Sequence, residues 1–352
     1  MELNNLLFLL LLIFFGFFFN KYLLVTFKKS KSNLFSDNQF TKPQAFHENA
    51  TYRLGGLTIF SLLAIVFLYL FFFKNIYFPE YISFSVLFFS LGMLDDLKVN
   101  IRPKFRLLLM ILFLMILVIF NEFYIEKTGL AFLNNMLEID IFSLFFVCLC
   151  FLFIINGSNL VDGFNGLLGI HTLIIFVTLF LINLIEGNSD IMYFLFFASF
   201  VILIFLKFNF PNAQMFLGDS GSYLVGSLIA VSVVKTSILT PNIHPFFYCV
   251  LLFYLFFEVF FSFIRKLFFV RRSPLFPDDQ HLHMLFYQFL LKGNKKKLSS
   301  NYFVSIYINI IYLFLITPVF FFTDNGLFCR YYFFLLLIIY IYFYKTLYGK
   351  AK

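Results

Sequence analysis

The chain has 352 residues, of which 62% are hydrophobic and only 12% are charged. Because about a quarter of the residues of an ordinary soluble domain are charged, this composition excludes a water-soluble protein and predicts an integral membrane protein. The formal net charge of +8 is typical of basic cytoplasmic loops, and no Arg-rich tract indicates a nucleic-acid partner.

Long runs of Phe, Leu and Ile predict the membrane spans. A span needs about 20 mostly apolar residues, and about eleven stretches reach or approach that length. These stretches are 5–27, 54–73, 81–94, 105–120, 141–155, 167–185, 191–208, 222–234, 244–269, 302–322 and 328–348. The predicted fold class is therefore an all-α integral membrane protein, in which residues 1–352 form a single polytopic domain.

Five polar segments interrupt the apolar chain. They are 42–56, 94–106, 156–166, 209–222 and 271–283. With the spans counted as above, all five fall on the loops that carry most of the Lys and Arg, and the positive-inside rule places these loops in the cytoplasm. Charge is costly near a membrane and usually marks chemistry there, so we expect the five segments to form one cytoplasmic site.

Two adjacent carboxylates, Asp95 and Asp96, directly follow the third span. Neighbouring negative charges repel unless a cation or a proton lies between them, and Mg²⁺ prefers hard oxygen ligands that it shares with phosphates. An isolated Asp-Asp pair would be read as an ordinary solvated helix end. Here Lys98 and other basic residues follow in the same loop, which favours a site for a metal and a phosphate.

The segment 156–166 has three Gly, and its polar residues recur every three positions. Glycine permits tight turns and close approach of the backbone to a ligand. On a helical turn, Asn156, Asn159, Asp162 and Asn165 would lie roughly on one face. The alternative is a plain Gly/Asn turn, which needs fewer of these residues.

Gly218-Asp219-Ser220-Gly221-Ser222 opens a span. A Ser or Asp at a helix start caps it, and the free N–H groups there attract anions. A plain N-cap is an equally good interpretation of this segment taken alone.

His281 and His283 stand two residues apart, a spacing that does not place them on one helix face and argues against a helical zinc pair. In a loop they could donate to phosphate oxygens. Lys42 and Arg53 precede the second span, and taken alone they are best read as topology charges.

Together these segments resemble the polyprenyl-phosphate N-acetylhexosamine-1-phosphate transferase family. The matching pieces, in order, are Gly55-Gly56, Asp95-Asp96, the segment 156–166, the segment 218–222, and Pro277-Asp278 leading to His281-Leu282-His283. The last motif is more similar to the N-acetylglucosamine branch than to the muramyl-pentapeptide branch. The chain departs from the family at Asn165 and Met284, where many relatives have Asp and His, and at Glu258, where Asp is expected.

The resemblance implies transfer of an N-acetylhexosamine-1-phosphate, most simply N-acetylglucosamine-1-phosphate, from a UDP-sugar to undecaprenyl or another polyprenyl phosphate. UMP is released, and the product initiates a cell-envelope polysaccharide. The implied cofactor is Mg²⁺, with Mn²⁺ as the alternative. The implied location is the inner (plasma) membrane, where the protein spans the lipid several times and its active site faces the cytoplasm. The implied partners are the two substrates and membrane lipid, with no nucleic acid. A homodimer is one possible oligomeric state.

The resemblance also assigns roles to individual residues. Catalytic roles fall to Asp95, Asp96 and Asp162, and metal binding falls to Asp219 with Asp162. The expected substrate-binding residues are Lys42, Lys98, Asn159, Asn165, His281 and His283.

Three alternatives stay open at this point. One is a phospho-N-acetylmuramoyl-pentapeptide transferase. The second is a secondary transporter, which would place its polar groups near the bilayer midplane in two related halves. The third is a catalytically inactive scaffold.

Overall fold

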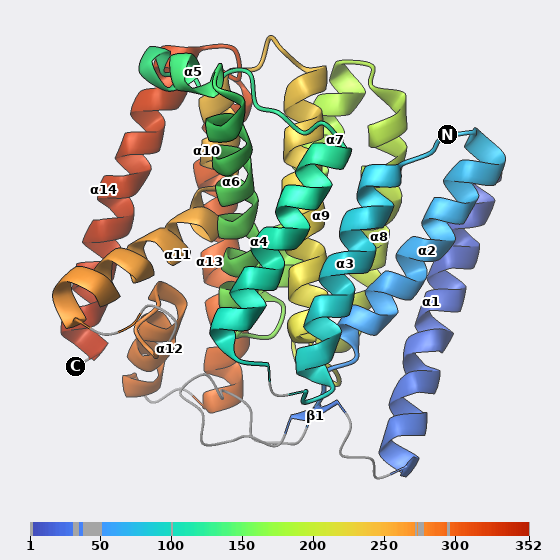
Figure 1. Ribbon diagram of the computed structural model, residues 1–352. Helices are drawn as coiled ribbons and strands as arrows, with labels where there is room; N and C mark the ends of the chain where they lie inside the picture. Colours follow the sequence, from blue (N-terminus) through green and yellow to red (C-terminus); the bar gives the residue numbers. More distant parts are fainter. Residues whose placement is uncertain are drawn as a thin grey trace.

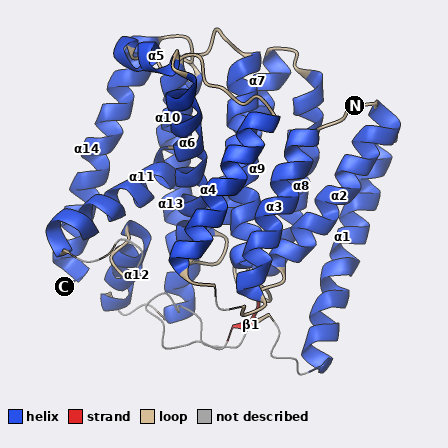
Figure 2. Ribbon diagram, viewed as in Figure 1, coloured by secondary structure: helices blue, strands red, loops and turns tan. Residues whose placement is uncertain are grey.

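The computed structural model describes residues 3–30, 35–37, 51–99, 101–271, 273, 278–293 and 296–351, and it is a bundle of helices (Figures 1 and 2). The long helices are α1 (Leu3–Ser30), α2 (Gly55–Lys74), α3 (Pro79–Asp96), α4 (Pro103–Phe120), α6 (Asp140–Val161), α7 (Leu167–Ile185), α8 (Ser189–Asn209), α9 (Gly218–Leu239), α13 (Lys297–Phe320) and α14 (Gly326–Ala351). The shorter ones are α5 (Ala131–Leu137), α10 (Pro245–Leu251), α11 (Phe253–Ile264), the π-helix η1 (Arg265–Val270) and α12 (Leu282–Lys292).

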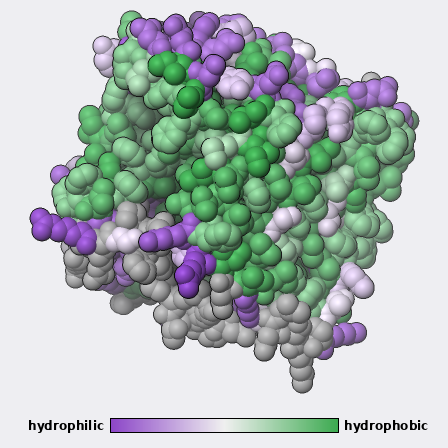
Figure 3. Space-filling view, viewed as in Figure 1, coloured by the Kyte–Doolittle hydropathy of each residue, from purple (hydrophilic) through white to green (hydrophobic). Residues whose placement is uncertain are grey.

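Nine helices of the described chain are long and apolar enough to cross a membrane. Each of the eleven predicted spans corresponds to a helix or, for the ninth, to a helix pair, which confirms an all-α membrane fold. The third, fifth and eighth spans looked short in the sequence because polar motifs occupy one end of α3, α6 and α9. Hydrophobic side chains cover the middle of the face drawn in Figure 3, as expected for a surface that meets lipid.

The ninth predicted span is not one straight helix. α10 and the helix that follows it meet at Leu252 with a bend of 73°, so that α11 crosses the bundle obliquely (Figure 1). The predicted span over 244–269 thus corresponds to a bent pair of helices. The bend could not be predicted because residues 246–270 contain no Gly or Pro to mark it. A tertiary contact lies at the bend instead, since the Tyr312 hydroxyl donates to the Leu251 carbonyl oxygen at 2.5 Å.

α9 is the central helix, and it packs closely on α3 and α6 because its faces carry small residues. A Cβ atom added at Gly92 of α3 would meet the Asp219 carbonyl group. One added at Gly226 would lie 2.8 Å from Ser158 Oγ of α6. At the other end of α3 and α9, Lys235 of α9 forms an ion pair with Glu80 of α3.

A small antiparallel pair of strands lies at the end of the bundle where α3 ends and α9 begins (Figure 1). β1 (Ser36–Asp37) pairs with β2 (Thr51–Tyr52), with Ser36 opposite Tyr52. The Phe216 N–H donates to the Tyr52 carbonyl oxygen at 2.8 Å. β2 therefore delivers the residues that follow it to the start of α9.

Candidate functional site

A carboxylate of one helix caps the start of another. Asp96, in the last turn of α3, accepts hydrogen bonds from the N–H groups of Asp219 at 3.0 Å and Ser220 at 2.9 Å, and from the Ser220 hydroxyl at 2.6 Å. The N-cap residue of α9, Leu217, gives no side-chain cap, so Asp96 satisfies donors that every helix start leaves open. The local cap by Ser or Asp, one of the two interpretations of this segment, is not formed, because the capping group comes from a different helix.

Asp219 meets the polar end of α6. Its Oδ1 accepts from the Asn159 side-chain amide at 2.7 Å, and the same amide lies 2.9 Å from Ser222 Oγ. The Asp219 side chain keeps 27% of its surface exposed, so a ligand at this end of the bundle can reach it. The structure thus joins two segments that are 60 residues apart in the sequence.

Arg53 is the positive group of this cluster, and its role was missed in the sequence. Its guanidinium donates to Asp37 at 2.8 Å and lies 3.6 Å from Asp96 Oδ1 and 3.9 Å from Asp219 Oδ2. Burial alone would lower the pKa of Arg53, but the charges of Asp219 and Asp37 outweigh it and raise the pKa. The sequence feature that could have indicated this role is the position of Arg53, two residues before Gly55-Gly56.

Those two glycines explain how Arg53 reaches the site. A Cβ atom at Gly55 would lie 2.8 Å from the Phe216 carbonyl oxygen, and one at Gly56 would meet Ser220. The N–H groups of Gly55 and Gly56 also donate to the carbonyl oxygens of Phe216 and Leu217 at 2.9 and 2.8 Å. Only a chain without side chains here can lie against the start of α9.

Asp95 forms its own ion pair beside Asp96. Its Oδ2 accepts from Arg106 of α4 at 2.7 Å. Burial raises the pKa of Asp95, and the hydrogen bond from Arg106 opposes that shift. Lys98 follows in a left-handed conformation with φ of 61°, and its N–H donates to the Asp95 carbonyl oxygen at 2.9 Å, which keeps this predicted substrate-binding residue within one turn of the carboxylate pair.

Asp162 ends α6 as its C-cap residue and is half-buried. Its carboxylate forms no side-chain hydrogen bond within the described ranges. Burial first, and then the negative charge of Asp219, raise the pKa of Asp162 well above its ordinary value. For Asp96, burial and again Asp219 raise the pKa to about 6. Three carboxyl groups therefore repel one another around Arg53, and this arrangement would be relieved by a cation or a proton.

The carboxylates of this cluster are of the ligand type that a hard divalent cation prefers, but their positions in this structure do not form a complete metal site. Among the described residues, no three Asp, Glu, His or Cys side chains stand where they would together hold a metal ion. Carboxylate oxygens are nevertheless the ligands that Mg²⁺ prefers. In this cluster the Asp96 carboxylate is bound to backbone N–H groups and the Asp95 carboxylate to Arg106, which leaves Asp162 and Asp219 as the candidate ligands.

The predicted common face for residues 156, 159, 162 and 165 does not exist, because α6 ends at Val161. Asn156 donates to the Leu152 carbonyl oxygen at 2.8 Å and not toward Asp219. Asn165 lies in the loop that follows, buried, where its side-chain amide donates to the Pro211 carbonyl oxygen at 2.9 Å. Substrate binding by Asn165 stays a prediction, and in this structure its side chain anchors the loop.

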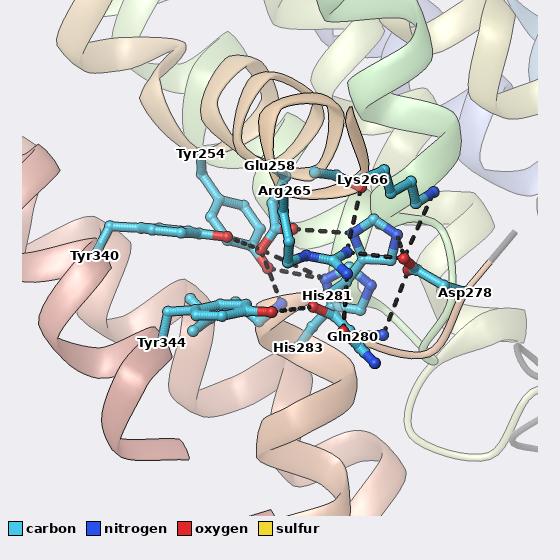
Figure 4. A network of polar contacts seen from close by, with 12 residues as sticks. Tyr254, Glu258, Arg265, Lys266, Asp278, Gln280, His281, His283, Tyr340 and Tyr344 are labelled. Carbon is cyan, nitrogen blue, oxygen red and sulfur yellow. Dashed lines mark hydrogen bonds and ion pairs between the residues drawn. The ribbon is translucent and has the colours of Figure 1, made fainter. Parts of the chain in front are cut away.

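A second polar cluster surrounds Glu258 of α11, which is 1% exposed (Figure 4). Its carboxylate accepts from the Tyr340 hydroxyl at 2.9 Å and the Leu282 N–H at 3.2 Å, and it lies 3.3 Å from His281 Nδ1. His283 Nδ1 pairs with the Tyr254 hydroxyl at 3.2 Å. Burial lowers the pKa of His283 to about 4, so this imidazole is neutral near pH 7.

Residues 278–283 of the Pro-Asp-x-x-His-Leu-His motif are bound to η1 and α14 in the same view (Figure 4). Asp278 accepts from Arg265 at 2.9 Å and lies 3.2 Å from His281 Nε2. Burial would raise the pKa of Asp278, but its electrostatic interactions with His281, Arg265 and Lys266 outweigh burial, and the pKa is lowered. Asp278 is therefore ionised near neutral pH.

The loop after α6 connects the two clusters. The Phe164 ring lies against His283, with ring centroids 5.7 Å apart, and against Tyr287 at 5.3 Å. Asp162, two residues earlier, electrostatically couples to Asp219 and Arg53. A displacement of this loop would therefore reach both clusters.

The described parts of all five polar segments meet at one end of the bundle, at the bottom of Figure 1. Asp96, Asn159 and Asp219 are linked by hydrogen bonds, and Asp95 and Asp162 lie within electrostatic range of Asp219. His281 and His283 lie in the adjoining cluster and are buried. Lys42 lies outside the described residues.

A family model described as glycosyl transferase family 4 matches residues 78–237. This segment runs from α3 to α9 and holds Asp95, Asp96, Asp162 and Asp219. Arg53 and the Glu258 cluster lie outside it.

Three named relatives add to this match. The chain is 29% identical over 271 residues to the undecaprenyl-phosphate alpha-N-acetylglucosaminyl 1-phosphate transferase of Thermotoga maritima, covering 77% of this chain and 78% of that protein. It is 24% identical over 252 residues to the protein of the same name from Escherichia coli K12, covering 68% and 66%. It is 32% identical over 193 residues to the phospho-N-acetylmuramoyl-pentapeptide-transferase of Dictyoglomus turgidum, covering 53% and 59%.

Proposed function

Because the chain belongs to glycosyl transferase family 4, we propose that it transfers N-acetylglucosamine-1-phosphate from UDP-N-acetylglucosamine to undecaprenyl phosphate. An oxygen of the lipid phosphate bonds to the sugar-bearing phosphorus of the donor. The bond from that phosphorus to the bridging oxygen breaks, and UMP leaves with this oxygen. The product is an undecaprenyl diphosphate sugar, a starting unit for an envelope polysaccharide.

One observation carries this proposal: four Asp side chains and Arg53 gather where a bundle of apolar helices ends. The lipid acceptor needs an apolar surface for its chain, and the nucleotide donor needs polar groups at the water-facing end. The basic residues of the same loops favour the cytoplasmic side of the inner membrane for this end. A transporter would instead need polar groups near the bilayer midplane.

Both substrates are anionic where they react, so the site has to offset repulsion between phosphates. Asp162 and Asp219 would hold Mg²⁺, or Mn²⁺ as the alternative. Such an ion, when bound, neutralises the diphosphate and stabilises the leaving UMP. Arg53 would add a fixed positive charge, and its planar guanidinium suits phosphate oxygens.

The two adjacent carboxylates have different tasks in this proposal. Asp96 holds the start of α9 in place through the N–H groups of Asp219 and Ser220. Asp95 and Lys98 then face the lipid phosphate and orient it. A phosphate monoester is already largely ionised at pH 7, so orientation matters more than proton removal. Asn159 fixes the Asp219 carboxylate through its 2.7 Å hydrogen bond.

The test is a reconstituted assay of the purified protein with undecaprenyl phosphate, Mg²⁺ and one nucleotide sugar at a time. We expect UMP release with UDP-N-acetylglucosamine and a lipid product with the mass of the diphosphate sugar. Release only with UDP-N-acetylmuramoyl-pentapeptide would establish the second candidate, which the Dictyoglomus turgidum relative favours. The proposal fails if no nucleotide sugar gives UMP and a lipid product.

A further inference from the structure

α13 lies outside the matched segment 78–237 and carries none of the site motifs, yet it has buried polar side chains on one face. Asn301, Asn309 and Tyr312 are 3%, 2% and 6% exposed. Polar groups inside a membrane bundle are costly unless they form hydrogen bonds, so their partners indicate what they are for. All three bind backbone groups of the segments that carry the site.

The first contact holds the loop after α6. Asn301 Oδ1 accepts from the Asn165 N–H at 2.8 Å. At the next residue, Asn209 Oδ1 of α8 accepts from the Gly166 N–H at 2.6 Å. The loop that begins with Asp162 is therefore fixed by one amide side chain from each of two helices.

The second contact continues along the same segment. Asn309 Nδ2 donates to the Leu167 carbonyl oxygen at 3.1 Å, in the first turn of α7. Its Oδ1 lies 3.2 Å from His171 Nδ1, one turn further along α7. The loop and the helix that follows it are thus aligned with α13 over more than one turn.

The third contact reaches the other cluster. Tyr312 donates to the Leu251 carbonyl oxygen at 2.5 Å, at the bend between α10 and α11. α11 then carries Glu258, which contacts His281. One face of α13 therefore contacts both the loop of Asp162 and the bend that sets the direction of α11, the helix that carries Glu258.

We propose that α13 is a positioning element for the reaction, and that Asn301 is its principal residue because it sets the place of the loop that carries Asp162. The inference rests on the proposed function of that site. Asn301 touches no substrate in this scheme, and it acts through the Asn165 N–H.

The experiment compares two replacements of similar size. Asn301→Leu removes the acceptor, whereas Asn301→Asp keeps an oxygen at the same position. We expect Asn301→Leu to lower kcat about tenfold or more, with the KM for the nucleotide sugar changed less than about twofold. We expect Asn301→Asp to restore kcat to within about threefold of the parent. Thr317→Val is the matched control, because Thr317 is on the exposed side of α13 and, among the described residues, its hydroxyl bonds within its own helix, to the Leu313 carbonyl oxygen.

A second readout does not depend on turnover. Hydrogen–deuterium exchange of peptides covering 162–167 should speed up in Asn301→Leu and stay near the parent rate in Asn301→Asp. If the Leu variant does not fold, Tyr312→Phe serves instead. We expect its kcat to fall about threefold, while the kcat of Thr317→Val stays at the parent value. The inference is overturned if Asn301→Leu keeps parent kcat and exchange, or if Asn301→Asp is as impaired as Asn301→Leu. A parent protein without turnover would refute the proposed function, and the exchange comparison would still test the tether.

Discussion

The Asp96 carboxylate and Ser220 form a two-point contact between helices, through the Ser220 N–H at 2.9 Å and the Ser220 hydroxyl at 2.6 Å. This contact fixes the last turn of α3 against the first turn of α9. Asp95 lies in the former turn and Asp219 in the latter. The geometry of the acidic cluster therefore depends on a hydrogen-bonded cap and not only on the proposed metal ion.

The first prediction concerns pH and Asp96. Its pKa is raised to about 6, first by burial and then by the charge of Asp219, against about 4 in an unfolded chain. Between these values the folded protein binds more protons than the unfolded one, so the contribution of Asp96 to stability falls as pH rises from about 4 to 6. The measurement is the unfolding midpoint of the parent and of Asp96→Asn across this range in a metal-free buffer. The parent should lose stability relative to the variant as pH rises, and a constant difference would contradict the assignment.

The second prediction concerns Arg53. Arg53→Lys keeps the positive charge but loses the planar guanidinium that reaches Asp37, Asp96 and Asp219. We expect kcat/KM to fall about tenfold or more, because Arg and Lys are not interchangeable at a site with several acceptors. Arg330→Lys is the matched control at the opposite end, where Arg330 donates to the Gly129 carbonyl oxygen. Equal effects of the two replacements would mean that Arg53 is only a structural or topology charge.

The third prediction concerns the divalent ion. Asp219→Ala should lower UMP release by about a hundredfold or more at any Mg²⁺ concentration, since a catalytic metal stabilises charge in the transition state. Asp162→Asn should instead raise the Mg²⁺ concentration needed for half-maximal rate. Activity is measured after chelation and again during titration with Mg²⁺ or Mn²⁺. Near-normal turnover of Asp219→Ala, or of the parent protein in excess chelator, would refute the metal assignment.

The fourth prediction concerns the Glu258 cluster. Glu258→Gln removes the negative charge that accepts from the Tyr340 hydroxyl and the Leu282 N–H and lies beside His281, and it replaces one of the two acceptor oxygens by an NH2 donor. Each hydrogen bond to a charged group contributes about 1.5–3 kcal/mol, and this replacement weakens more than one of them, so the unfolding midpoint should fall strongly. Tyr340→Phe removes only one of these hydrogen bonds and should cost less, about 1.5–3 kcal/mol. Thermal unfolding of both variants in detergent tests this order, and a larger loss in Tyr340→Phe would contradict it.

The sequence predicted the spans because an apolar run of span length is a strong local signal. It predicted the gathering of the carboxylates because counting the spans placed all five polar segments on one side of the membrane. An apolar run of span length and an Asp-Asp pair are visible without tertiary structure. Arg53 was read as a topology charge because its partners Asp96 and Asp219 are more than forty residues away in the chain. No local sequence motif marks an ion pair between residues so far apart, so Arg53 could not be distinguished from an ordinary loop charge.

Two other features could not be predicted from the sequence for the same physical reason. The bend at Leu252 has no Gly or Pro, and the Tyr312 hydroxyl that binds beside it comes from a different helix. The Asn156 to Asn165 spacing suggested one helical face, but α6 ends at Val161 and the loop is held by Asn301 and Asn209. In both cases tertiary hydrogen bonds, which no local pattern encodes, decide the backbone.

The last prediction uses the close approach of α3 to α9. A Cβ atom at Gly92 would meet the Asp219 carbonyl group, which is backbone and cannot rotate away. Gly92→Ala should therefore force the helices apart, cost about 1–3 kcal/mol, and lower kcat by displacing Asp219 from Asn159. Gly349→Ala is the matched control, since an added Cβ there meets nothing within 4 Å and alanine favours a helix over glycine. Unfolding midpoints and kcat are measured for both variants. If Gly92→Ala matched Gly349→Ala in both, the packing of these helices would not set the position of Asp219, and the acidic cluster would have to be held by the Asp96 cap alone.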